Sequence, residues 1–148
     1  MGFVGVTDDF EAVTGICEYG RRLYQGGMVA GNEGNISCRV RENEVWVTPT
    51  MESKGFLNPD MLIKLDMEGR PIGANKYRAS SETKMHLGIL LANESLSCVI
   101  HAHPAYATLL AAIGEPVDGA MLPEAMYLFG EQIPISEYAH PGTNELAD

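Results

Sequence analysis

Two histidines in the segment His101-Ala102-His103 stand at the end of an apolar run that is typical of a β-strand. Because the side chains of a strand alternate between its two faces, we expect His101 and His103 on the same face. Two imidazoles so placed can share one metal ion, although a zinc site needs at least a third protein ligand. Pro104 cannot continue a β-ladder, so the pair is expected at the mouth of a sheet. The alternative is a pair of ordinary exposed histidines near a loop.

A second candidate segment is Ser80-Ser81-Glu82, which precedes a helix predicted from Glu82 to about Asn93. Serines before a helix can cap it, and an acidic residue in its first turn complements the helix dipole. The same hydroxyls and free N–H groups can also form an anion site. Glu82 beside such a site has the chemistry of a general acid or base. His86 lies on the same helical face as Glu82, and we favour a packing or hydrogen-bonding role for it.

The third candidate is the glycine- and asparagine-rich segment at residues 31–35. Glycines such as Gly34 let the backbone curl and present N–H groups to an anion. The segment has no Gly-Lys-Ser/Thr sequence and is therefore not a nucleotide-binding P-loop. A tight turn before a strand is the alternative interpretation.

The elements that must position these residues follow from the hydrophobic pattern. Apolar residues at helical spacing, followed by two glycines, predict a helix over residues 8–26. Short extended runs predict strands at residues 36–40, 45–48, 61–66, 96–101 and 133–135. Further helices are predicted at residues 106–113 and 123–130.

Length and composition limit the class of protein. The chain has 148 residues and 16.1 kDa, the size of one domain, with 45% apolar residues. Its 10 Lys and Arg against 20 Asp and Glu give a net charge of −10, and no basic stripe predicts a nucleic-acid partner. No apolar run approaches the length of a membrane span. Three scattered cysteines predict buried free thiols and a cytoplasmic location.

Four short motifs occur in a specific order along the chain. They are Gly-Asn-Ile-Ser-x-Arg at residues 34–39, Thr-Pro-Thr at 48–50, Ser-Ser-Glu-x-x-x-His at 80–86 and His-x-His-Pro at 101–104. This order resembles the class II aldolase/adducin family, most closely its L-fuculose-1-phosphate aldolase branch. The resemblance implies an α/β fold with three α/β/α layers around a central, mainly antiparallel sheet. It also implies a homotetramer with active sites between subunits.

The same resemblance implies a function. A metal-dependent aldolase would cleave a sugar 1-phosphate, similar to L-fuculose 1-phosphate, to dihydroxyacetone phosphate and an aldehyde. Zn²⁺, or another divalent metal, would be bound by His101 and His103, and by Glu82 when substrate is absent. Glu82 is also the implied catalytic acid/base. The implied contacts to the substrate phosphate come from Gly34, Asn35, Thr50, Ser80 and Ser81.

The sequence departs from the family pattern in three places. The third metal-binding histidine is expected after Asp148, so residues 1–148 are interpreted as a single domain that lacks its C-terminal part. Such a fragment is expected to associate and to be inactive as an aldolase. Met51 stands where many relatives have a phosphate-contacting glycine. The segment 121–124 stands where the fuculose branch often has a tyrosine, so the sugar is expected to differ.

Other functions remain open at this point. A pentulose-phosphate 4-epimerase is the nearest rival, but such enzymes usually carry aspartate where Glu82 stands. Decarboxylase and dehydratase branches of the family are further alternatives. A non-catalytic, adducin-like interaction domain has no need of Glu82, His101 and His103, and all three are intact. The last alternative is an unrelated α/β domain with incidental histidines.

Overall fold

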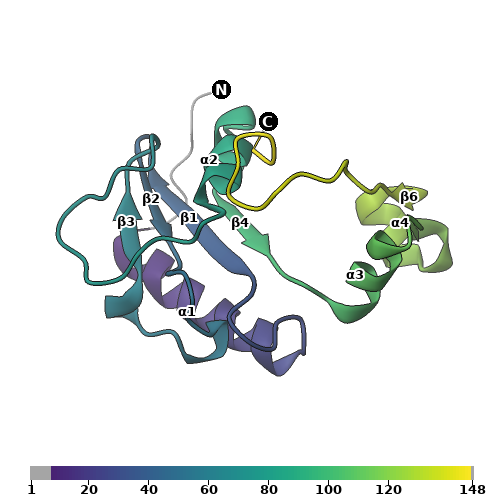
Figure 1. Cartoon of the computed structure of the whole chain (residues 1–148), viewed down its shortest axis with the longest axis horizontal. Helices are drawn as coiled ribbons and strands as arrows, with labels where there is room; N and C mark the ends of the chain where they lie inside the picture. Colours follow the sequence, from purple (N-terminus) through teal and green to yellow (C-terminus); the bar gives the residue numbers. More distant parts are fainter. Residues whose placement is uncertain (1–7, 148) are drawn as a thin grey trace. The chain divides into compact units, whose positions relative to one another are not determined.

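The computed structural model describes residues 8–147 and divides the chain into two compact units. The first unit comprises residues 8–102 together with 139–147, and the second is His103–Tyr138. Figure 1 shows that the first unit contains a β-sheet with two helices, and that the second contains the shorter helices.

The sheet of the first unit has four strands in the order β3-β2-β1-β4, and every neighbouring pair is antiparallel. The strands are β1 (Asn35–Arg41), β2 (Glu44–Val47), β3 (Ile63–Leu65) and β4 (Cys98–His101). β1 and β2 form the predicted hairpin. In the β1–β4 ladder, Asn35 faces His101 and Cys38 faces Cys98. The register therefore joins the start of β1 to the end of β4.

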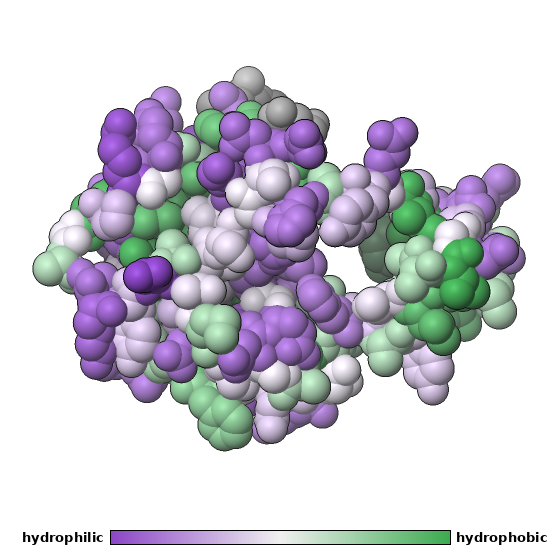
Figure 2. All heavy atoms as spheres, in the orientation of Figure 1, coloured by the Kyte–Doolittle hydropathy of each residue, from purple (hydrophilic) through white to green (hydrophobic). Residues whose placement is uncertain are grey.

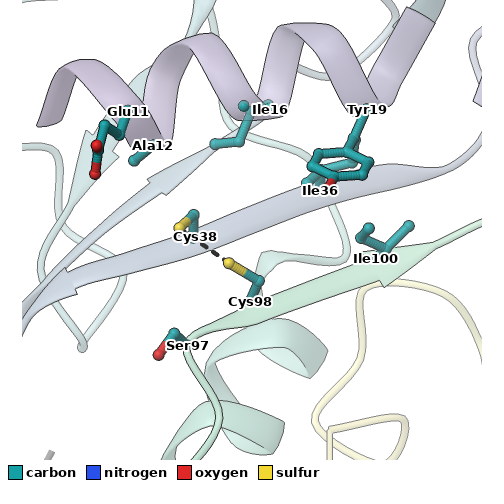
Figure 3. Close-up of a pocket in the computed structure, with 10 residues that line it drawn as sticks. Glu11, Ala12, Ile16, Tyr19, Ile36, Cys38, Ser97, Cys98 and Ile100 are labelled. Atoms are coloured by element: carbon teal, nitrogen blue, oxygen red, sulfur yellow. Dashed lines mark hydrogen bonds between the residues drawn. The ribbon is translucent and has the colours of Figure 1, made fainter. Parts of the chain in front are cut away.

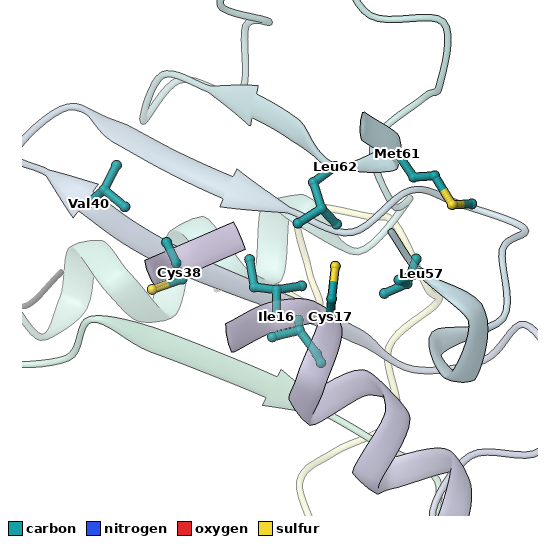
Figure 4. Close-up of a cluster of buried hydrophobic side chains, with 9 residues drawn as sticks. Ile16, Cys17, Cys38, Val40, Leu57, Met61 and Leu62 are labelled. Atoms are coloured by element: carbon teal, nitrogen blue, oxygen red, sulfur yellow. The ribbon is translucent and has the colours of Figure 1, made fainter. Parts of the chain in front are cut away.

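Helix α1 (Asp9–Gln25) covers one face of this sheet. The Asp8 side chain caps it by accepting a hydrogen bond of 2.8 Å from the Glu11 N–H, and the helix ends before Gly26. Ile16 and its neighbours pack on the sheet, and each such fully buried aliphatic side chain contributes about 1.5–3 kcal/mol. Figure 4 shows part of this cluster, which consists of Ala12, Ile16, Cys17, Ile36, Cys38, Val40, Leu57, Met61 and Leu62.

Helix α2 (Thr83–Ala92) covers the opposite face. Its Leu87 and Leu90 belong to a second buried cluster with Val45, Val47, Ile63, Leu65 and Met67. β1 separates the two clusters because its side chains alternate. Ile36, Cys38 and Val40 belong to the α1 cluster, whereas Asn35, Ser37 and Arg39 bond to residues of the α2 segment. The first unit therefore has the predicted three-layer α/β/α arrangement.

The second unit is small and carries little buried surface. It contains α3 (Ala105–Ala112), β5 (Val117–Asp118), the 3-10 turn η3 (Gly119–Met121), α4 (Pro123–Phe129) and β6 (Gln132–Ile133). β5 and β6 pair antiparallel, and neither α3 nor α4 contains a buried residue. Figure 2 shows apolar side chains gathered on this unit, and the exposed ones include Tyr106, Leu109, Ile113 and Tyr127.

The structure corrects several element predictions. The strand predicted at residues 61–66 is shorter in the structure and spans only Ile63–Leu65, because Met61 belongs to the 3-10 turn η2 (Pro59–Met61). Another 3-10 turn, η1 (Lys54–Phe56), precedes it. β5 was not predicted, since two residues are too few to give a pattern. Cys98 is exposed on the edge strand β4, so the expectation of three buried thiols is wrong for it, although all three are free. No helix within residues 8–147 is long and apolar enough to cross a membrane.

Candidate active site

Glu82 is the centre of the candidate site. It occupies the position immediately before α2, and its side chain makes no capping hydrogen bond to the helix. Instead, its carboxylate oxygen Oε2 lies 2.8 Å from Nδ1 of His101 and accepts a hydrogen bond of 2.5 Å from Nδ2 of Asn35. The helix begins at Thr83, one residue later than predicted, and the Ser80 hydroxyl accepts a hydrogen bond of 3.3 Å from the Glu82 N–H. The Glu82 side chain therefore does not cap α2, and the hydroxyl that bonds at this end of the helix belongs to Ser80, one of the two serines expected to cap it.

The sheet register explains how three distant segments meet at this carboxylate. Asn35 and His101 are cross-strand partners on the α2 face of the sheet. Gly34 permits the approach, because a Cβ at this position would lie 2.8 Å from the His101 carbonyl oxygen and 2.8 Å from Val29 Cγ1. Gly34 also has a φ of +74°, which glycine adopts without steric cost. A side chain there would separate the two strand ends that carry the site.

The site is largely shielded from water. The side chains of Glu82 and His101 are 15% and 28% exposed, and Asn35 is buried. A carboxylate in such a position can exchange a proton with a bound molecule while its orientation is fixed by neighbouring donors. The arrangement therefore has the chemistry of a positioned acid/base next to an imidazole.

His86 lies one turn along α2 from Glu82 and is almost fully buried. Its Nδ1 is 2.8 Å from the Ser37 hydroxyl, which confirms the expected hydrogen-bonding role. The pKa of His86 is lowered to about 4, mainly by burial and to a smaller extent by the nearby His101, whereas Glu82 opposes this effect. His86 is therefore neutral at physiological pH. Its Nε2 has no hydrogen-bond partner among the described residues.

The segments predicted to bind phosphate lie side by side. Ile36 N–H donates to the Thr48 hydroxyl over 3.1 Å, and Ser80 N–H donates to the Thr48 carbonyl over 3.1 Å. Thr50 N–H donates to the Arg78 carbonyl over 2.9 Å. The loops at residues 34–36, 48–50 and 78–82 are thus joined by hydrogen bonds. Phosphate binding by Gly34, Asn35, Thr50, Ser80 and Ser81 itself stays a prediction.

Met51 adjoins these loops and has an unusual backbone conformation. Its φ of +62° makes it the single non-glycine residue with a positive φ within residues 8–147, and its side chain is exposed. A left-handed conformation is unfavourable for any residue with a Cβ. The glycine that the family resemblance implies at this position would adopt it freely.

Lys54 is a feature that the sequence did not indicate. Its side chain is 1% exposed, and its Nζ donates to the carbonyl oxygens of Asn32, over 2.7 Å, and Glu52. Burial lowers the pKa of Lys54, and Glu33, Glu52 and Glu82 partly oppose this effect. The ammonium group ties the glycine-rich loop to the loop after Thr50. A lysine in a polar segment gives no periodic signal, so sequence reasoning could not have found it.

The proposed metal ligands are only partly brought together. Glu82 and His101 are in contact, and carboxylate oxygen and imidazole nitrogen are donors that zinc accepts. His103 is the first residue of the second unit, so its relation to His101 stays a prediction. Among residues 8–147, no group of three His, Cys, Asp or Glu side chains is arranged in this structure to hold a metal ion. The two donors in contact fit a divalent metal in type but do not complete a site.

Comparison with known proteins gives a consistent result. The family described as "Class II Aldolase and Adducin N-terminal domain" matches residues 14–148. The chain is 32% identical to a 3-oxo-tetronate 4-phosphate decarboxylase of Haemophilus influenzae, over 88% of this chain and 63% of that protein. It is 33% identical to an L-fuculose phosphate aldolase of Methanococcus maripaludis, over 85% of this chain and 66% of that protein. The chain thus spans less than two-thirds of the length of either relative.

A solved structure has the same fold. An L-fuculose 1-phosphate aldolase superimposes with a TM-score of 0.83 and 27% sequence identity, and the match covers 96% of this chain and 65% of that one. The predicted α/β class is therefore confirmed by the strands and helices of the first unit and by this likeness.

Proposed function

The chain belongs to the class II aldolase and adducin family, and from this premise we propose that it is the catalytic part of a metal-dependent sugar-phosphate aldolase. The proposed reaction cleaves a sugar 1-phosphate, similar to L-fuculose 1-phosphate, to dihydroxyacetone phosphate and an aldehyde. The observation that carries the proposal is the contact of Glu82 with both His101 and Asn35. The 33% identity to an L-fuculose phosphate aldolase supports the same reaction class.

Glu82 is the proposed acid/base in this reaction. Its carboxylate oxygen Oε2 accepts a hydrogen bond from Asn35, which fixes the direction in which the carboxylate points. A carboxylate that is held in this way can take a proton from a substrate carbon or hydroxyl and return it to the product. Because most of the side chain is shielded, little water competes for that proton.

We further propose that His101, His103 and Glu82 hold a divalent metal, with zinc as the first candidate. When bound, such an ion supplies Lewis acidity toward a substrate carbonyl. His101 and Glu82 supply the nitrogen and oxygen donors that zinc accepts. Asn35 keeps Glu82 beside His101 and so keeps the two donors together.

The substrate phosphate is proposed to lie against Gly34, Asn35, Thr50, Ser80 and Ser81. The N–H groups of Thr50 and Ser80 already donate to Arg78 and Thr48. Contacts from Thr50 and Ser80 must therefore come from their hydroxyl groups. The Ser80 hydroxyl accepts a hydrogen bond from the Glu82 N–H, and its own proton is still available as a donor. Lys54, which bonds to the glycine-rich loop at Asn32, adds a positive charge beside that loop.

A decarboxylase is the second candidate function, because the identity to a 3-oxo-tetronate 4-phosphate decarboxylase is nearly the same, 32%. Both reactions break a carbon–carbon bond, but they release different products. Incubation of the full-length protein with L-fuculose 1-phosphate and a divalent metal is expected to yield dihydroxyacetone phosphate, detected by a coupled reductase. Incubation with 3-oxo-tetronate 4-phosphate tests for released carbon dioxide. Failure to exceed the Glu82→Gln variant with either substrate would contradict a lyase function.

The assembly and location are also proposals. We propose a homotetramer in the cytoplasm, as the family resemblance and the free thiols suggest. Light scattering coupled to size-exclusion chromatography is expected to give four times the mass of one chain. A monomer at micromolar concentration would contradict the tetramer.

A further inference from the structure

Cys38 and Cys98 form a close pair of free thiols on the α1 face of the sheet. Their sulfur atoms are 3.0 Å apart, and they come from the neighbouring strands β1 and β4. Figure 3 shows both side chains between α1 and the strands β1 and β4. They line a cavity of about 480 Å³. Ile36, Ile100 and Tyr19 supply much of the remaining lining. The pair lies outside the candidate active site, which is on the α2 face.

The backbone geometry of this pair suits a covalent link. Arg39 N–H donates to the Ser97 carbonyl over 2.6 Å, so Cys38 and Cys98 form a non-hydrogen-bonded pair of the antiparallel ladder. Cα atoms of such pairs are about 4.5 Å apart. A disulfide requires a Cα separation of about 4.4–6.8 Å. The two cysteines can therefore be joined without displacement of the strands.

The two thiols differ in reactivity. Cys38 is buried, whereas Cys98 is exposed on the edge strand. The hydrogen bond between the two thiols lowers the pKa of Cys98, against the effect of the partial burial of its sulfur atom. The same hydrogen bond raises the pKa of Cys38, and burial adds to this rise. Cys98 is therefore the first of the two to form a thiolate, the nucleophilic state of cysteine.

We propose that Cys38 and Cys98 are a redox modification site, at which a low-molecular-weight disulfide of the glutathione class forms an intramolecular disulfide. Cys98 thiolate attacks one sulfur of the reagent, forms a mixed disulfide and releases the first thiolate. Cys38 then loses its proton to water and attacks the Cys98 sulfur, which releases the second thiolate. The protein loses two protons and two electrons, and the reagent takes up both to become two thiols. The proposal is independent of the proposed aldolase function.

The site is coupled to the strands that carry Asn35 and His101. These two residues are partners three positions along the same β1–β4 ladder, on the opposite face of the sheet. A bond between Cys38 and Cys98 would tie the two strands at that point. It would do so without contact with Glu82, His101 or any proposed phosphate ligand.

Mass spectrometry of the oxidised chain tests the proposal directly. Trypsin places the three cysteines in three different peptides, residues 1–21, 23–39 and 85–148. After treatment of the folded chain with oxidised glutathione, a link is expected between peptides 23–39 and 85–148 only. The count of free thiols should fall from three to one, and dithiothreitol should restore all three. A link to peptide 1–21, or separate glutathione adducts without any link, would overturn the proposal.

Single variants separate the roles of the two thiols. Cys17→Ser is the matched control, because Cys17 is a free, buried cysteine that does not belong to the Cys38–Cys98 pair. The link between Cys38 and Cys98 is expected to form in this variant as in the wild type. Cys38→Ser should accumulate a stable glutathione adduct on Cys98. Cys98→Ser should react at least tenfold more slowly at Cys38, because that thiol is buried. Equal reaction rates of Cys38→Ser and Cys98→Ser would contradict the assignment of Cys98 as the attacking residue.

Discussion

Asn35 and His101 face each other across β1 and β4, and both contact the same carboxylate oxygen of Glu82. Three segments that are distant in sequence therefore converge on one atom. Glu82 receives a neutral donor on one side and an imidazole on the other. A change in any of the three side chains should therefore alter the hydrogen bonds of the other two.

Replacement of Glu82 by glutamine should remove the acid/base and keep the fold. General acid–base catalysis contributes about 10²–10⁴-fold, so the turnover of the sugar phosphate by the full-length protein should fall by that factor or more. Glutamine is of the same size and can still contact Asn35 and His101, so circular dichroism should be unchanged. Glu94→Gln is the matched control, because Glu94 is exposed in the turn after α2, and its kinetics should equal those of the wild type. Full activity in Glu82→Gln would remove Glu82 from the mechanism.

His86 should make the first unit sensitive to acid. Its pKa is lowered to about 4, mainly by burial, and His101 and Glu82 are the titratable neighbours that also act on it. As the pH falls below about 6.5, the unfolded chain binds a proton on this histidine before the folded chain does. The free energy of unfolding should therefore fall by up to about 3 kcal/mol by pH ~4.

The His86→Gln variant isolates this contribution. Glutamine can retain a hydrogen bond to Ser37 but does not titrate, so its unfolding free energy should change less between neutral and acidic pH. His140→Gln, at an exposed histidine, should follow the wild-type curve. Urea denaturation across this pH range is the measurement. Parallel curves for wild type and His86→Gln would show that His86 does not carry the acid sensitivity.

Lys54 should give a pH dependence in the alkaline range. Burial lowers its pKa, so the folded chain loses this proton at lower pH than the unfolded chain does. The destabilising cost of the buried charge is present at neutral pH and is relieved as the pH rises toward about 10.4. Lys54→Met should lack this rise in unfolding free energy. Lys84→Met, at an exposed lysine, should retain it, and a rise of equal size in both variants would contradict the assignment.

The folded chain should be more stable with glycine at position 51 than with alanine. Its φ of +62° costs about 1–2 kcal/mol for a residue with a Cβ, and alanine keeps this cost whereas glycine removes it. Thermal denaturation of Met51→Gly and Met51→Ala should therefore differ by about 1 kcal/mol in favour of glycine. At the exposed helical residue Leu91 the order should reverse, with glycine less stable than alanine by about 1 kcal/mol. If alanine gave the more stable chain at both positions, the backbone at Met51 would not be strained.

Local patterns predicted most of the first unit, because its helices and strands are long enough to show periodicity. The helix at residues 8–26 was located from its cap, its apolar spacing and its terminal glycines, and α1 agrees within one residue at each end. β5 and β6 were hard to locate because each has two residues and is defined by pairing alone. The function of Glu82 could not be chosen from its position, since a helix start suits both a capping and a catalytic side chain. Its contacts with Asn35 and His101 decide against capping.

The remaining part of the site depends on tertiary structure. Lys54 is buried because two carbonyl groups from separate loops surround its ammonium group, and no local sequence pattern encodes such an arrangement. The proximity of Cys38 to Cys98 likewise depends on the register of two strands that are far apart in the chain. Conversely, the family motifs identified Gly34 and Met51 before their backbone conformations were known.

The alternation of side chains along β1 also limits how this strand can change by insertion or deletion. Asn35 and Cys38 lie an odd number of positions apart, which puts the carboxylate contact and the thiol pair on opposite faces of the sheet. Loss of one residue between them would reverse the face of one relative to the other. Either Asn35 would then turn toward the core under α1, or Cys38 would turn toward α2. The length of this short segment is therefore fixed more strictly than the identity of the residues within it.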